Sequence, residues 1–231
     1  MNQEARTTFS FNQKVRQCLC DVVYELFAFG LKVIFHLFFC VRIVGRENCP
    51  RRGGPLLVIS NHVSEWDPPF LGTFLPWQVH WMAKVELFES LGGWANGFFR
   101  MLHCVPIDRE KADLHAVKQT IRLLKGSRPV VVFAEGGIRT DKTSLLGASP
   151  GLKEGAAAMA ILGDCPILPV LLNGTISAYR WQNWIFFRRR MLEIVIGPVF
   201  ELKERDRTKA TEQILKRLLE LKPDLKQQGI C

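Results

Sequence analysis

The feature that most restricts the fold is an alternation of short strand-like runs with helical or turn segments along residues 55–222. The runs are rich in β-branched and aliphatic residues and are too short for helices, as buried strands are. The strand-like runs cover 55–60, 79–84, 102–107, 129–134, 166–172 and 191–197. Helical or turn segments are expected around 68–75, 86–99, 111–125, 152–163 and 205–222. This order predicts an α/β domain, which places its chemistry in loops beyond the carboxyl ends of strands.

An apolar segment at residues 22–41 precedes this pattern and is long enough to be considered as a membrane span. On a helical wheel, the polar residues of this region form one narrow stripe: Lys14, Asp21, Glu25, Lys32 and His36. For a crossing, the gain from the apolar side chains and the cost of Glu25 and Lys32 roughly cancel, and basic residues flank both ends. We therefore expect a helix, or a bent pair of helices, that lies in the interface of one leaflet. A true span and a buried soluble helix are the alternatives.

The turn-forming sequence PRRGG at residues 50–54 separates this segment from the alternating pattern. It predicts an N-terminal membrane-association segment at residues 1–50 and an α/β domain at residues 51–231. Residues 181–190 are a second candidate for lipid contact, because aromatic residues there stand beside three arginines. An edge hairpin is the alternative for that stretch.

The charge balance narrows the class of partner. Thirty-one Lys and Arg against 22 Asp and Glu give a net charge of +9, which favours a phosphate substrate, a lipid headgroup layer or nucleic acid. No helix-turn-helix, RNP-like or zinc pattern occurs in the sequence, so we do not expect nucleic acid binding. Seven scattered cysteines without a Cys-x-x-Cys pair indicate neither a metal site nor a disulfide framework. No signal-peptide pattern is visible, so we expect a reduced, membrane-associated protein that faces the cytosol.

The first polar cluster, NHVSEWD at residues 61–67, directly follows a strand-like run. His62 and Asp67 can meet only in a turn, because positions five apart point about 140° away from each other on a helix. Pro68 and Pro69 push Asp67 out of the helical region and start a helix after it, which predicts such a turn. A carboxylate on one ring nitrogen makes the other a better base for a hydroxyl proton. The alternative makes Asp67 a helix N-cap and His62 an incidental loop residue.

A second cluster, FAEGGIRT at residues 133–140, carries a strand-like run into a glycine turn. Gly136 and Gly137 allow close backbone approach, and Arg139 offers a planar fork of donors to a phosphate. Glu135 can hold that arginine or a substrate hydroxyl. The alternative is an ordinary turn with an exposed arginine. Between the two clusters, Arg109 follows Asp108 at the end of a strand-like run, where a surface ion pair is the alternative.

Taken in order, these clusters resemble the glycerolipid acyltransferase family, of the 1-acylglycerol-3-phosphate acyltransferase type, over about residues 55–175. NHVSEWD matches the first block of that family, Asn-His-x-Ser-x-x-Asp, in full. The second block resembles AKVELFESLG at 83–92 with VPIDR at 105–109, the third FAEGGIRT, and the fourth CPILPV at 165–170. There are two departures: Ala134 stands for the usual proline, and Ile138 displaces the arginine by one place.

The resemblance implies an α/β fold with a mixed sheet flanked by helices, and it implies roles for individual residues. His62 would be the catalytic base and Asp67 its support, so that a substrate hydroxyl attacks an acyl thioester directly, without a cofactor or metal. The substrate-binding residues would be Asn61, Lys84, Arg109, Glu135, Gly136, Gly137 and Arg139. Pro169 would take the structural proline position of the fourth block.

The implied reaction moves a fatty acyl group from acyl-CoA or acyl carrier protein to the free hydroxyl of a lysophospholipid. The expected acceptor is 1-acylglycerol-3-phosphate, which gives phosphatidic acid. A different lyso-lipid acceptor and a non-catalytic membrane-binding module are the alternatives, and only the module makes His62 dispensable. Membrane lipid would be contacted through residues 22–41. Removal of residues 1–45 would then leave a soluble core that acts poorly on acceptors held in a bilayer.

Overall fold

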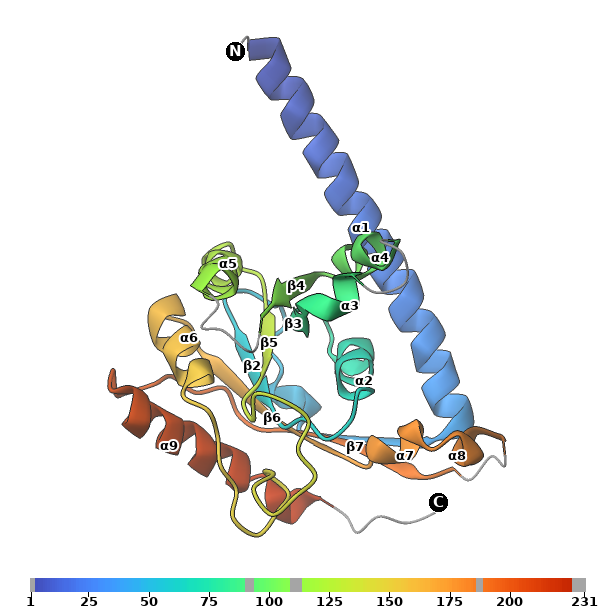
Figure 1. Cartoon of the computed structure of the whole chain (residues 1–231), viewed down its shortest axis with the longest axis vertical. Helices are drawn as coiled ribbons and strands as arrows, with labels where there is room; N and C mark the ends of the chain where they lie inside the picture. Colours follow the sequence, from blue (N-terminus) through green and yellow to red (C-terminus); the bar gives the residue numbers. More distant parts are fainter. Residues whose placement is uncertain (1–2, 90–93, 109–113, 186–188, 226–231) are drawn as a thin grey trace.

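A computed structural model describes residues 3–89, 94–108, 114–185 and 189–225 (Figure 1). Within this part of the chain, the strands are β1 (Cys40–Val44), β2 (Leu57–Ser60), β3 (His80–Lys84), β4 (Cys104–Ile107), β5 (Val130–Phe133), β6 (Ile167–Asn173) and β7 (Met191–Ile196). The α-helices are α1 (Gln3–Phe38), α2 (Asp67–Phe74), α3 (Val85–Glu89), α4 (Trp94–Met101), α5 (Leu114–Lys125), α6 (Gly155–Gly163), α7 (Ile176–Tyr179), α8 (Trp181–Ile185) and α9 (Arg207–Leu219). Short 3₁₀ helices cover Arg46–Asn48 and Lys222–Asp224.

The strands form one sheet in the order β1-β7-β6-β2-β5-β3-β4. All neighbouring pairs are parallel except β6 and β7, which run antiparallel. The expected mixed sheet flanked by helices is therefore confirmed. Each of the six strand-like runs read from the sequence corresponds to a strand, β2 to β7.

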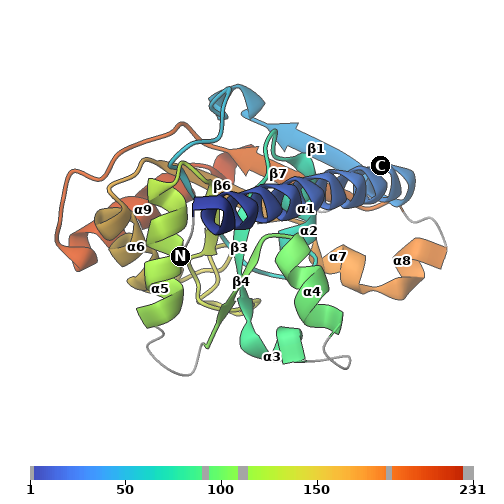
Figure 2. The same ribbon diagram turned by 90° about the horizontal axis from the view of Figure 1, so that it is seen from above.

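Helices cover both faces of the sheet and bury two apolar clusters. Because side chains alternate along a strand, Val58 of β2 faces one cluster and Leu57 and Ile59 face the other. The helices α5, α6 and α9 pack on the Leu57 face, whereas α1 and α2 pack on the Val58 face (Figure 1). Figure 2 shows α1 running across the molecule past α2 and α4 toward α8. Central strands that are apolar on both faces are typical of this layered arrangement.

Strand β1 is the one strand of the described residues that the sequence did not predict, and the short helices α7 and α8 were not predicted either. Residues 22–41 were expected to be helical, but the helix ends at Phe38 and Cys40 begins a strand parallel to β7. Residues 40–44, which precede the predicted division at residue 50, form an edge of the sheet. Among the described cysteines, Cys18, Cys20, Cys49, Cys104 and Cys165 are free thiols. Nothing in the spacing of the cysteines identifies a pair.

Helix α1 has two different apolar faces. Tyr24 and Phe35 are buried against the core, where Phe35 packs on Phe70, Phe74 and Trp66. Away from the core lies a row of exposed apolar residues that are spaced three or four positions apart, which we call the apolar stripe. It consists of Val15, Leu19, Val22, Leu26, Phe29, Val33 and Leu37. No helix in the described part of the chain has the length and apolar character needed to cross a bilayer.

Part of the polar stripe of α1 follows the edge between the helix and the core. The amide of Gln78 donates to the Asp21 carbonyl at 3.1 Å and to the Glu25 carboxylate at 2.9 Å. Arg189 donates to the carbonyl of His36 at 3.2 Å. Among these three contacts, only that of Glu25 involves a side chain of the polar stripe, because Asp21 and His36 accept through their backbone carbonyls. The residues of the apolar stripe are exposed.

Candidate active site

The candidate site lies where the carboxyl ends of β2, β3, β5 and β6 meet. Asn61 and His62 directly follow β2, and Lys84 is the last residue of β3. Glu135 lies two residues after the end of β5, and the segment after β6 lies at the same edge of the sheet. Loops beyond the carboxyl ends of parallel strands are the usual place for a site in such a sheet. Pro169 of the fourth block is buried in β6 opposite Ile59 of β2, and its carbonyl accepts a hydrogen bond from Gly197 at 2.9 Å.

His62 and Asp67 are in contact, as the turn between them predicts. Nδ1 of His62 lies 2.9 Å from Oδ2 of Asp67, and both side chains are buried. The same oxygen accepts hydrogen bonds from the backbone N–H groups of Val63 at 2.7 Å and Ser64 at 2.9 Å. Asp67 is the first residue of α2, yet its carboxylate points back into the turn and not along the helix. The N-cap alternative does not describe this arrangement.

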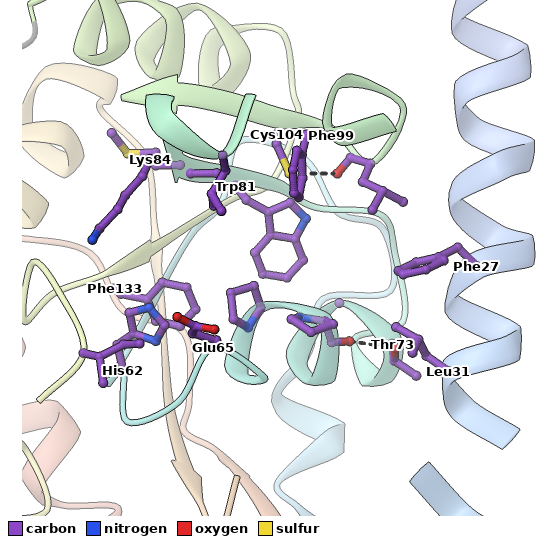
Figure 3. Close-up of a pocket in the computed structure, with 18 of the residues that line it drawn as sticks. Phe27, Leu31, His62, Glu65, Thr73, Trp81, Lys84, Phe99, Cys104 and Phe133 are labelled. Atoms are coloured by element: carbon purple, nitrogen blue, oxygen red, sulfur yellow. Dashed lines mark hydrogen bonds between the residues drawn. The ribbon is translucent and has the colours of Figure 1, made fainter. Parts of the chain in front are cut away.

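The ring of His62 is held from a second side by Phe133, the last residue of β5. The two rings stack with centroids 4.2 Å apart and an angle of 18° between their planes. Because Nδ1 faces Asp67, the nitrogen left for a substrate proton is Nε2. His62 lies in the wall of a large cavity together with Phe133, as Figure 3 shows.

The cavity has a volume of about 890 Å³ and is mainly apolar. Its wall comes from several elements: α1 supplies Phe27 and Leu31, β3 supplies Trp81, and α4 supplies Phe99 (Figure 3). Glu65 and Lys84 are polar residues of the wall, and both are exposed. The sequence did not identify the aromatic wall, because residues at the spacing of a helix or strand interior look like ordinary core. Of the predicted site residues, His62, Lys84, Gly136 and Gly137 line the cavity.

Glu135 is placed differently from the sequence expectation. Its side chain is fully buried, with Oε2 accepting from the backbone N–H of His62 at 2.6 Å and Oε1 from that of Leu145 at 2.5 Å. Burial raises the pKa of the Glu135 carboxyl above its ordinary value, although the two N–H donors act in the opposite direction. In the structure, this carboxylate joins two loops behind the site and does not reach the cavity wall.

Asn61 is also a buried connection between loops. Its Oδ1 accepts from the backbone N–H of Leu172 at 2.7 Å, and its Nδ2 donates to the carbonyl of Leu172 at 2.9 Å. These two hydrogen bonds connect the end of β2 to the end of β6. They involve both the oxygen and the nitrogen of the Asn61 side-chain amide. The Asn61 side chain is fully buried and is not part of the cavity wall.

The glycine turn brings Ile138, and not Arg139, into the cavity wall. The backbone N–H of Arg139 donates to the carbonyl of His62 at 2.8 Å, and its guanidinium reaches the carbonyl of Gly151 at 3.4 Å. Gly136 has a φ of 72°, in the left-handed region that other residues rarely adopt, so the turn favours a glycine at this position. Arg109 lies outside the described residues.

The fold and this site define an enzyme of the acyltransferase class. A model of the family described as Acyltransferase matches residues 40–173, more than half of the chain, and the chain belongs to this family. It is an acyltransferase of phospholipid biosynthesis. The departures at Ala134 and Ile138 therefore occur within a member of the family.

Curated relatives and a solved structure agree with this assignment. The chain is similar to a 1-acyl-sn-glycerol-3-phosphate acyltransferase of Bacillus subtilis, with 30% identity over 89% of the chain and 100% of the relative. It is also similar to the enzyme of that name from Streptococcus pneumoniae, with 30% identity over 57% of the chain and 46% of the relative. A crystal structure of the 1-acyl-sn-glycerophosphate acyltransferase PlsC from Thermotoga maritima shares the fold. That match has a TM-score of 0.64 and 23% identity, and it covers 94% of this chain and 85% of the other.

Proposed function

We propose that this protein transfers a fatty acyl group to the free hydroxyl of 1-acylglycerol-3-phosphate and so makes phosphatidic acid. The single observation that carries the proposal is the buried contact between His62 and Asp67 at the wall of a large apolar cavity. The names of the relatives support the choice of acceptor, since the match to the Bacillus subtilis enzyme covers that enzyme entirely. The acyl donor is a thioester, acyl-CoA or acyl carrier protein.

In the proposed mechanism, Nε2 of His62 takes the proton of the acceptor hydroxyl as its oxygen attacks the thioester carbonyl. The new C–O bond forms and the C–S bond breaks, and the proton passes from His62 to the departing thiolate. Asp67 keeps the proton of Nδ1 in place and stabilises the charged ring through the 2.9 Å contact. The proposal includes no metal or cofactor.

The apolar cavity is the proposed site of a fatty acyl chain. Pockets for small ligands have volumes of about 300–1,000 Å³ and a few polar groups at one end, and this cavity follows that pattern. Lys84 extends from β3 on the same side of the cavity as Phe133 and His62 (Figure 3). Its ammonium is the proposed partner of the acceptor phosphate, together with Arg109 and the glycine turn at Gly136 and Gly137. In this proposal, Arg139 holds the turn through Gly151.

The protein is proposed to lie on the cytosolic face of a membrane, with the apolar stripe of α1 in one leaflet. Exposed apolar residues in a continuous row are unusual on a monomer in water and typical of an interface. Trp181 and Ile185 of α8 are also exposed, and Trp184 of the same helix packs on Phe38 and Phe39 at the end of α1. Residues 181–185 therefore extend the same surface, while residues 186–188 lie outside the described residues.

The test is acyl transfer by the purified protein with a panel of lyso-lipid acceptors and both donor types, read by mass spectrometry. His62→Ala should lower the rate at least about 100-fold, because a positioned general base contributes about 10²–10⁴-fold. The matched control is His115→Ala, which removes an exposed histidine of α5 and should leave the rate unchanged. Wild-type turnover in His62→Ala would reject the mechanism. Preference for an acceptor without a phosphate would reject the proposed substrate.

A further inference from the structure

Thr175, two residues after β6, makes a buried contact with the site that no sequence motif predicts. Its side chain is fully buried, and Oγ1 donates a hydrogen bond to Oδ1 of Asp67. The other carboxylate oxygen, Oδ2, is the one that faces Nδ1 of His62. Thr175 thus holds the oxygen of Asp67 that His62 does not use. Because the family match ends at residue 173, Thr175 also lies outside the matched region.

The Thr175 side chain does not cap the helix that follows it, although capping is the usual role of a threonine at a helix N-terminus. Thr175 is the N-cap residue of α7, where a hydroxyl normally accepts a hydrogen bond from an N–H group of the first turn. Here the side chain makes no such bond to α7. The hydroxyl is directed at Asp67 instead, so the stability of the short helix does not explain the residue type.

The segment that carries Thr175 is itself fixed to the site. The two hydrogen bonds between the Asn61 side chain and Leu172 join β6 to the loop that contains His62. Gly174 has a φ of 87°, in the left-handed region that suits glycine, and it redirects the chain just before Thr175. The position of the Thr175 hydroxyl relative to His62 and Asp67 is therefore defined by the hydrogen bonds between Asn61 and Leu172 and by the turn at Gly174.

We propose that Thr175 is a positioning residue for acyl transfer, acting through Asp67. The hydroxyl fixes the plane of the Asp67 carboxylate, so that Oδ2 stays aligned with Nδ1 of His62 and Nε2 stays directed at the acceptor hydroxyl. Without the donor, the carboxylate loses its hydrogen bond on Oδ1 and can rotate, and small errors in the position of a base are costly in rate. The inference rests on the proposed function of His62 as the base.

The experiment replaces Thr175 with valine, which keeps the shape and removes the hydroxyl. We expect kcat to fall roughly 10- to 100-fold, the range produced by losing one hydrogen bond to a charged group, with KM for both substrates nearly unchanged. Thr175→Ser restores the donor and should retain most of the wild-type kcat. The matched control is Thr120→Val, because Thr120 of α5 is equally buried and its hydroxyl has no partner. This control should keep full activity.

A double-mutant comparison with Asp67 distinguishes a positioning role of Thr175 from a general effect on the fold. If Thr175 acts through the carboxylate, Thr175→Val should cost much less in an Asp67→Asn background than in the wild type. Thr175→Ala, measured in both backgrounds with thermal unfolding of each variant, provides the same comparison if the valine variant does not fold. Equal loss in both backgrounds, or a change in KM alone, would overturn the inference.

The two proposals fail in different ways. If His62 is not the base, His62→Ala stays active. If only the role of Thr175 is wrong, His62→Ala is inactive while Thr175→Val and Thr175→Ala keep the wild-type kcat.

Discussion

At the scale of single residues, Glu135 shows how a polar residue of a motif can serve the site without touching a substrate. Each carboxylate oxygen accepts a hydrogen bond from a backbone N–H group. One donor is His62, and the other is Leu145, which lies ten residues after Glu135. The carboxylate therefore fixes the backbone of the proposed base relative to the loop after β5. Buried acceptors of this kind matter mainly through the cost of leaving their donors unpaired.

Glu135→Gln is expected to destabilise the protein by about 1.5–3 kcal/mol. Glutamine has one oxygen for two N–H groups, so its NH₂ group must face one of the donors inside the protein. The measurement is the free energy of unfolding from urea titration. The comparison is Glu65→Gln, an exposed carboxylate of the cavity wall, which should change stability by less than about 0.5 kcal/mol. Equal stability of the two variants would contradict the role assigned to Glu135.

At the scale of elements, α1 contacts the core through a stacked set of rings that includes two buried histidines. His80 of β3 stacks on His103 with centroids 4.7 Å apart, and His103 stacks on Tyr24 of α1 at 5.2 Å. Burial lowers the pKa of His80 to about 4, and His103 and Arg128 act in the same direction. Burial also lowers the pKa of His103, although Asp21 of α1, 3.3 Å from its Nε2, opposes this. The surroundings of both rings therefore disfavour the charged form.

The stability of the protein should fall as the pH is lowered from about 6.5 to about 4. In this range an unfolded His80, with its ordinary pKa of 6.5, binds a proton that the folded form excludes, so acid favours the unfolded state. One pKa unit corresponds to about 1.4 kcal/mol, which sets a loss on the order of 3 kcal/mol for this residue. The measurement compares urea unfolding at about pH 7.5 and about pH 5 for wild type and His80→Phe. A pH dependence that is identical in both proteins would refute the assignment.

Local patterns in the sequence predicted most elements, and long-range contacts account for what they missed. The strands β2 to β7 were predicted because each is a short apolar run between turn residues. Strand β1 was not, because the apolar sequence continues from Phe38 through Val41 without a glycine or proline to mark the end of the helix. Its partner, β7, lies far along the chain.

The same distinction applies to the site. The contact of His62 with Asp67 could be predicted, since the two prolines after Asp67 define the turn within a few residues. The contacts of Asn61 with Leu172 and of Thr175 with Asp67 could not, because they depend on the order of strands in the sheet. For Glu135, the sequence indicated the right loop, but the residue type alone does not say whether a carboxylate faces a ligand or the backbone.

At the scale of the whole molecule, the first 45 residues include parts of the folded core as well as the apolar stripe. The sequence predicted that their removal would leave a soluble core. In the structure, the removal would take away β1, the buried side chains of Phe35 and Phe39, and the α1 part of the cavity wall. The loss of a single buried phenylalanine typically costs about 3–5 kcal/mol, against a total stability of about 5–15 kcal/mol.

We therefore expect the chain without residues 1–45 to lose cooperative unfolding and to aggregate. Circular dichroism during thermal unfolding, with light scattering, measures both effects. A full-length variant with Leu26, Phe29 and Val33 changed to serine removes only part of the apolar stripe. It should unfold cooperatively and show weaker binding to anionic lipid vesicles. A truncated chain that folds as well as this variant would show that the first 45 residues are dispensable for the core.

Helix α1 offers one face to the core and to the cavity and the opposite face to the surroundings. A foreign amphipathic helix grafted in its place would supply another apolar stripe but would leave the cavity open on one side, since Phe27 and Leu31 would be missing. Chimeras between relatives would have to exchange the helix and the cavity as one unit. The apolar stripe and the shape of the cavity would then be transferred together.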